Sequence, residues 1–185
     1  MRAPPHLAAA LRRFLRDEIG AILHEGVLIM PLMAWTWVSL FIYWDAYRLQ
    51  TTAMKASYTV ADIVSRQIVT LDRAYITGLH EVFDYLLADS APTTLRVSSI
   101  TFDADDNRYE VLWSYSPTGQ TALTTADLAL MTARLPIIPD DDTLIVVETS
   151  AHYDPVLDVG ITEFDYDTFV VTRPRRVPKI EFAAS

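Results

Sequence analysis

The chain carries one run of residues without a charged side chain that is long enough to cross a membrane. It extends from Gly26 to Trp44, between Glu25 and Asp45. As an α-helix, these nineteen residues span roughly 28 Å, which is close to the ~30 Å thickness of a hydrocarbon core. The sequence therefore predicts a transmembrane helix, which we place at residues 21–44.

The charges and aromatic residues that flank this run predict its orientation. Arginines precede the run and aromatic side chains gather at its far end: Arg2, Arg12, Arg13 and Arg16, then Tyr43, Trp44 and Tyr47. Basic residues mark the cytoplasmic side of a span, and aromatic rings favour the membrane interface. We expect a cytoplasmic N-terminus and a C-terminal part on the opposite side of the membrane.

A secretory signal peptide and a buried helix of a soluble protein also contain apolar runs. A secretory signal peptide has a shorter apolar region, followed by small residues at the cleavage site. Here the run ends at Trp44-Asp-Ala-Tyr-Arg48, which is a poor cleavage site of that kind. The run is also long for the apolar region of a signal peptide, and we disfavour a buried helix of a soluble protein as well.

The composition limits what the remainder of the chain binds. Apolar residues make up 51% of the 185 residues, there is no cysteine, and the formal net charge is −9. After Gly20 the chain has 11 Lys and Arg against 22 Asp and Glu, a formal charge of −11. Because nucleic-acid binding needs a basic surface, we expect no nucleic-acid partner. This charge is typical of an acidic, solvated surface.

The pattern after the apolar run predicts an α+β fold. Helical spacing of apolar residues continues over 45–90, as one helix or as two with a break near 65–70. A mainly antiparallel sheet domain is expected at 91–185. Its predicted elements are a hairpin of strands 95–102 and 109–115, a helix at 125–135, and strands at 143–149 and 163–172.

Acidic and histidine residues provide only weak candidates for chemistry. Asp103, Asp105 and Asn107 resemble the start of a calcium-binding loop, but Arg108 and Ser114 stand where the motif needs Gly and Glu. We favour a hairpin turn there, and a turn before a strand at 140–142. The four histidines, at positions 6, 24, 80 and 152, show no metal-ligand spacing. We predict no metal, no cofactor and no enzymatic activity, although a Ser–His–Asp arrangement formed in space stays open.

The residues before the apolar run form an unusual junction. Gly20 ends the basic leader, and Glu25 lies at the entrance of the span, where a carboxylate is costly unless it is paired. Cleavage between Gly20 and Ala21 would create an α-amino group one helical turn from Glu25. The amine of one subunit and the carboxylate of another could then neutralise each other between packed helices.

This junction resembles the prepilin signal of type IV filament proteins, and the whole chain is similar to TadE-like minor pseudopilins of the tight-adherence (Tad, or Flp) pilus system. The resemblance rests on Glu25 with Pro31 six residues on, and on short motifs: Asp62-Ile-Val-Ser-Arg-Gln67, Trp113-Ser-Tyr115, Val146-Val-Glu148, Tyr153-Asp-Pro155 and Thr172-Arg-Pro-Arg175. The family often has Phe or Tyr after the Glu, whereas Gly26 stands here.

The resemblance implies a bacterial inner-membrane protein with a periplasmic domain, which either stays in the membrane or is extracted into a surface pilus. Its leader, residues 1–20, would be removed by a prepilin peptidase at Gly20–Ala21. Its implied partners are other pilins, the inner-membrane assembly platform and the lipid bilayer, and Glu25 would act in assembly. The alternatives are an uncleaved anchor, a membrane-tethered periplasmic sensor or ligand-binding domain, and an anchored hydrolase.

Overall fold

The computed structural model describes the backbone of residues 18–88 and 92–183, with side chains from residue 25 onward in these ranges. Most of the predicted leader, residues 1–17, lies outside the described residues. The chain divides into two compact units, one ending at Trp44 and the other comprising Asp45–Ser185. The fold is α+β, as predicted: a long N-terminal apolar helix is followed by a small antiparallel sheet.

Helix α2, Glu18–Ser65, is continuous in sequence across the boundary between the units. It includes Pro31, which lacks the amide hydrogen that would bond to the carbonyl of Val27. Within the second unit, its buried residues recur at helical spacing and are mostly small: Ala46, Ala53, Ala56, Ser57, Val60, Ala61 and Val64. Small side chains on one face let this part of the helix approach the sheet closely.

The predicted break near 65–70 is confirmed. Helix α2 ends at Ser65, whose carbonyl accepts a hydrogen bond from the Arg175 amide at 2.7 Å. A two-residue strand, β1 (Leu71–Asp72), then leads into helix α3 (Arg73–Leu86). Asp72 caps α3 because its side chain accepts a hydrogen bond from the amide of Tyr75 at 2.7 Å.

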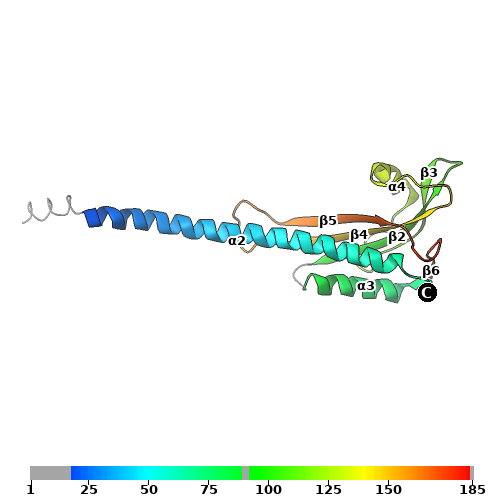
Figure 1. The fold of residues 1–185 in the computed structure, drawn as a ribbon, viewed down its shortest axis with the longest axis horizontal. Helices are drawn as coiled ribbons and strands as arrows, with labels where there is room; N and C mark the ends of the chain where they lie inside the picture. Colours follow the sequence, from blue (N-terminus) through cyan, green and yellow to red (C-terminus); the bar gives the residue numbers. More distant parts are fainter. Residues whose placement is uncertain (1–17, 89–91, 184–185) are drawn as a thin grey trace, which may run out of the picture. The chain divides into compact units, whose positions relative to one another are not determined.

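Four strands form the antiparallel sheet of the second unit, in the order β3-β2-β4-β5 (Figure 1). They are β2 (Thr93–Asp103), β3 (Arg108–Tyr115), β4 (Thr143–Tyr153) and β5 (Phe164–Thr172). The predicted hairpin is the β2–β3 pair, whose turn includes Asn107 at a φ of 48°. Strand β4 extends beyond the predicted strand at 143–149, because it pairs with β2 on one side and β5 on the other.

The central strand β4 has apolar residues on both faces of the sheet. Ile145 and Val147 belong to the cluster that packs against α2 and α3, whereas Leu144 and Val146 belong to a second cluster under helix α4 (Thr125–Met131). Figure 1 shows α3 and α4 on opposite sides of the sheet. The run of four apolar residues in sequence therefore reflects a strand that is covered on both faces.

Three short elements, β1 among them, were not predicted from the sequence. A 3-10 turn, η1 (Thr132–Arg134), ends the helical segment that was expected to reach 135. Strand β6 (Phe182–Ala183) pairs in parallel with β1, which lies far away in sequence. The Phe182 ring stacks on Trp113 and Tyr115 at centroid distances of 5.1 and 5.4 Å, so aromatic packing holds the C-terminal strand.

Candidate assembly site on the N-terminal helix

The apolar part of α2 exposes its side chains within the first unit. Val27, Met30 and Trp37 have exposed fractions of 71%, 73% and 69%. Among the described residues, one helix is long and apolar enough to cross a membrane, and only 6% of its most apolar 18-residue window is buried. A core helix of a soluble protein would be mostly buried. The segment therefore has the length and composition of a membrane anchor, which a signal sequence shares.

The residues of the predicted junction lie on one turn of this helix and the next. Gly20 and Ala21 have helical backbones, and Glu25 begins the part of α2 whose side chains are described. The Glu25 side chain is exposed, and the described residues show no ion pair to it. An exposed carboxylate next to exposed apolar side chains is available to a group outside this chain, which is what the predicted docking to a second subunit needs.

Two of the motifs in the second unit contact each other. The Asp62 carboxylate pairs with Arg66 at 2.8 Å and with Arg175 at 3.1 Å. The side chain of Gln67 bonds to the Tyr75 hydroxyl and, at 3.3 Å, to the carbonyl of Ile63. These short motifs therefore connect the end of α2 to the segment after β5, which is a role inside the folded unit.

The basic stretch after β5 is paired largely with acidic groups of its own unit. Arg173 contacts Asp142 at 2.7 Å, and Arg175 contacts Asp62. The stretch is Arg173-Pro-Arg-Arg176, and its charge alone does not say whether it meets its own domain or a neighbour. The structure shows that two of its arginines meet their own domain.

The acidic β2–β3 turn forms a network of local contacts. The Asp103 carboxylate accepts hydrogen bonds from the amides of Asp105 and Asp106 at 3.0 and 3.2 Å. Carboxylate oxygens of Asp103, Asp106 and Glu110 lie within 4.8 Å of one another. The Arg108 guanidinium contacts Asp106 at 2.8 Å and Glu110 at 2.7 Å, so an arginine already supplies positive charge there. The turn predicted for this segment is confirmed.

A histidine, an aspartate and a threonine meet where α3 faces β2. His80 Nε2 lies 2.9 Å from the Thr93 hydroxyl, and His80 Nδ1 lies 3.6 Å from Asp84. The Thr93 hydroxyl donates its proton directly to Asp84. Because that proton is directed to the carboxylate, His80 must donate to Thr93 and is not placed as a base toward it. The cluster links α3 to β2, in contrast to the proton path of a nucleophilic triad.

A second histidine pairs with an aspartate across two strands. His152 Nδ1 lies 2.7 Å from Asp165, and these residues are register partners on β4 and β5. The hydrogen bond from His152 to Asp165 raises the pKa of His152, and the nearby charges of Glu163 and Asp154 act in the same direction. This solvent-exposed pair joins the last residues of β4 to the first residues of β5.

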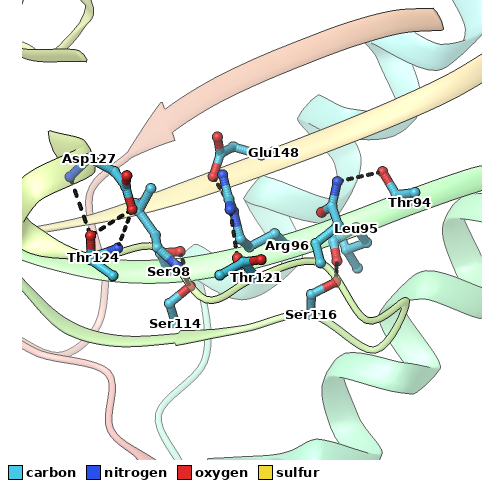
Figure 2. A network of polar contacts seen from close by, with 12 residues as sticks. Thr94, Leu95, Arg96, Ser98, Ser114, Ser116, Thr121, Thr124, Asp127 and Glu148 are labelled. Carbon is cyan, nitrogen blue, oxygen red and sulfur yellow. Dashed lines mark hydrogen bonds and ion pairs between the residues drawn. The ribbon is translucent and has the colours of Figure 1, made fainter. Parts of the chain in front are cut away.

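A polar network attaches the segment between β3 and α4 to the sheet (Figure 2). Arg96 on β2 contacts Glu148 on β4 at 2.7 Å and donates to the carbonyl of Thr121 at 2.7 Å. The Ser98 hydroxyl donates to Ser114 at 2.8 Å, and Ser114 accepts from an amide of the same segment. The network crosses three strands and gives Glu148, one of the motif residues, an internal partner.

Helix α4 begins with a capping box that the sequence signalled only through an acidic first turn. Thr124 and Asp127 bond reciprocally, with the side chain of each accepting from the backbone amide of the other (Figure 2). Hydrogen bonds that the Asp127 carboxylate accepts from the hydroxyl of Thr124, and then from its backbone amide, lower the pKa of Asp127. Beside α4 lies a hollow of about 420 Å³, whose lining includes the rings of Phe102 and Tyr109. Periodicity along single elements did not indicate this hollow, because it forms between α4 and the hairpin.

Comparison of the chain with protein-family models, with curated proteins and with solved structures finds no match. The resemblance to TadE-like pseudopilins therefore stays a prediction from the residues.

Proposed function

We propose that this protein is a membrane-anchored minor pseudopilin of a Tad pilus or a related secretion machine, acting through protein contacts. The observation that carries the proposal is the exposed apolar part of α2 with Glu25 at its start. Apolar side chains on all sides of a helix need a nonaqueous environment, which a bilayer or a bundle of packed helices provides. The basic leader, the junction and a small α+β unit after the helix are the remaining parts of a pilin.

In this proposal the junction has a mechanical role. A prepilin peptidase removes residues 1–20 on the cytoplasmic side, and the new amine at Ala21 becomes available. Glu25 then pairs with the amine of a neighbouring subunit, since both charges lose water when apolar helices pack together. The folded unit, on the periplasmic side, contacts other pilins or the assembly platform.

Intact-mass measurement of the protein extracted from membranes tests the processing step. We expect a mature chain that begins at Ala21 in cells with an active prepilin peptidase, and the full chain in cells without it. A Gly20→Leu variant should stay uncleaved, whereas Ala9→Leu in the same leader should be processed. A full-length mass in peptidase-positive cells would contradict the proposal.

Replacement of Glu25 tests the docking role. A Glu25→Ala variant should insert into the membrane and be cleaved, yet assemble few pili when these are counted by electron microscopy. Glu81→Ala is the matched control, because Glu81 is also an exposed acid on a helix. Normal piliation by Glu25→Ala would remove the docking role.

One observation favours a second candidate, a membrane-tethered ligand-binding domain. The hollow beside α4 has a volume within the usual range of small-molecule pockets, roughly 300–1,000 Å³, and Ala129 and Ile137 add apolar lining. This candidate needs neither leader cleavage nor Glu25. An intact leader together with normal behaviour of Glu25→Ala would favour it over the pseudopilin.

A further inference from the structure

The loop between β4 and β5 carries large apolar side chains at its tip that the described residues of the second unit leave uncovered. Val156 is 92% exposed and its neighbour Leu157 is 50% exposed. The loop has a defined conformation: Asp158 accepts a hydrogen bond from the amide of Gly160 at 3.0 Å, and Gly160 has a φ of 97°. Adjacent apolar side chains exposed to water forgo the free energy that burial would give, so contact of this tip with an apolar surface would be favourable.

This loop lies at the end of the second unit where α2 enters it. Val156 lines a hollow of about 370 Å³ together with residues from the start of this unit, including Asp45, Arg48 and Leu49. The last residue of β4, Tyr153, hydrogen-bonds through its hydroxyl to Asp45. In Figure 1 the loop joins the end of β4 to the start of β5, and the hollow lies at this end of the two strands. The tip of the loop therefore lies near Asp45, the first residue of the unit.

We propose that Val156 and Leu157 insert into the headgroup region of the bilayer that the apolar part of α2 crosses. The inference rests on the proposed membrane anchorage. Asp45 follows Trp44 directly in the chain, so the end of the unit that contains Asp45 must lie close to the membrane surface if residues 26–44 span it. Close to the membrane surface, the exposed side chains of Val156 and Leu157 would gain free energy by partition into the interface. Exposed Tyr47 adds an aromatic side chain that favours the same region.

The charges near the tip specify the kind of lipid surface. Asp154 and Asp158 flank the two apolar residues and are exposed, while the nearby Arg48 pairs with Asp45 at 3.0 Å. An acidic rim is repelled by anionic headgroups and is compatible with headgroups that carry a positive amine beside the phosphate. The loop therefore needs a zwitterionic lipid surface and gains nothing from anionic lipid.

The absence of cysteine makes a direct test simple. Single variants Val156→Cys, Leu32→Cys and Leu130→Cys carry an environment-sensitive fluorophore, and the full chain is reconstituted into phosphatidylcholine vesicles with spin-labelled lipid. Leu130 is the matched control because it is 88% exposed, does not line the hollow beside α4, and precedes β4, an 11-residue strand, whereas Val156 follows it. We expect blue-shifted, lipid-quenched emission at 156 and 32, and neither at 130.

The outcomes separate the inference from the proposed function. No quenching at 32 overturns membrane anchorage, whereas quenching at 32 without quenching at 156 overturns only the loop insertion. A blue shift at 156 without lipid quenching means that protein covers the loop, and it also overturns the inference.

A second substitution distinguishes insertion from mere proximity. Leu157→Asp combined with Val156→Cys should abolish quenching at 156. Leu157→Asp combined with Leu32→Cys should leave quenching at 32 unchanged. Persistent quenching at 156 would contradict insertion. Replacing part of the phosphatidylcholine by phosphatidylglycerol should not increase quenching at 156, and a requirement for the anionic lipid would contradict the assigned lipid surface.

Discussion

The two parts of helix α2 share one backbone conformation but have opposite side-chain environments. From Val27 to Trp44 the helix carries large apolar and aromatic side chains that are mostly exposed. From Asp45 to Ser65 its buried positions follow one face, and the exposed positions include polar residues. The first part therefore needs an apolar surrounding that the described residues largely do not supply, whereas the second part obtains it from the sheet.

Side-chain size distinguishes the two parts as clearly as burial does. The second part buries Ala53, Ala56 and Ala61, with exposed fractions of 2% or less. Alanine brings helix and sheet backbones close together, which suits one fixed protein neighbour. Bulky residues such as Trp35 and Trp37 in the first part suit a fluid or adaptable surrounding.

The largest effect should come from a charge in the first part. Leu32→Arg places a cation near the middle of the proposed span, at a cost of about 3 kcal/mol in membrane insertion. We expect a large fall in the membrane-bound fraction, measured by extraction with carbonate at high pH. The folding of the second unit should not change, because Leu32 belongs to the other unit.

The control for this variant is a charge on the exposed surface of the second unit. Val82→Arg changes a 39%-exposed residue of α3 and should leave membrane extraction unchanged. Equal loss of membrane binding in both variants would show that the first part of α2 has no special role in anchoring.

A smaller effect is expected when the same substitution, valine to alanine, is made in each of the two parts of α2. Val60 is fully buried, and Val27 is 71% exposed. Val60→Ala should lower the free energy of unfolding by about 2 kcal/mol, since two methyl groups leave the core and a cavity remains. Val27→Ala should leave it within about 0.5 kcal/mol of the wild-type value. Denaturant unfolding of the full chain in detergent measures both, and equal effects would refute the difference in environment.

Local patterns in the sequence predicted much of the fold. The apolar run, the break after Ser65 and the hairpin around Asn107 depend on residues that are neighbours in the chain. The parallel pair β1–β6 could not be predicted, because two-residue strands have no periodicity and meet only when the sheet brings them together. The same holds for the pairing of Asp62 with Arg175.

The candidate assembly site can be proposed from the sequence for a different reason, and it stays a prediction. Gly20, Ala21 and Glu25 are a linear signal, so their spacing is visible without a fold. The Val156–Leu157 tip gave no such signal, because a short apolar pair in a loop is ordinary in sequence. Its significance depends on exposure and on its position beside Asp45, which only the packed unit reveals.

The smallest effect should come from hydroxyl groups, one in each part of α2. Ser57 donates to the carbonyl of Ala53 at 2.7 Å and lies 2.6 Å from the buried hydroxyl of Thr149. Ser57→Ala leaves the Thr149 hydroxyl without that partner, so we expect a loss of about 1 kcal/mol in unfolding free energy. Ser39 bonds within its own helix, to the carbonyl of Trp35, and Ser39→Ala should have little effect.

A double variant shows whether the hydroxyl pair itself is the cause. Ser57→Ala with Thr149→Val removes both polar groups, so no buried hydroxyl of this pair remains without a partner and much of the lost stability should return. The measurement is denaturant unfolding of all four chains under one condition, read as a double-mutant cycle. Strict additivity would mean that the contact between α2 and β4 depends on shape and not on this hydrogen bond, and the second part of α2 would then be held by apolar packing throughout.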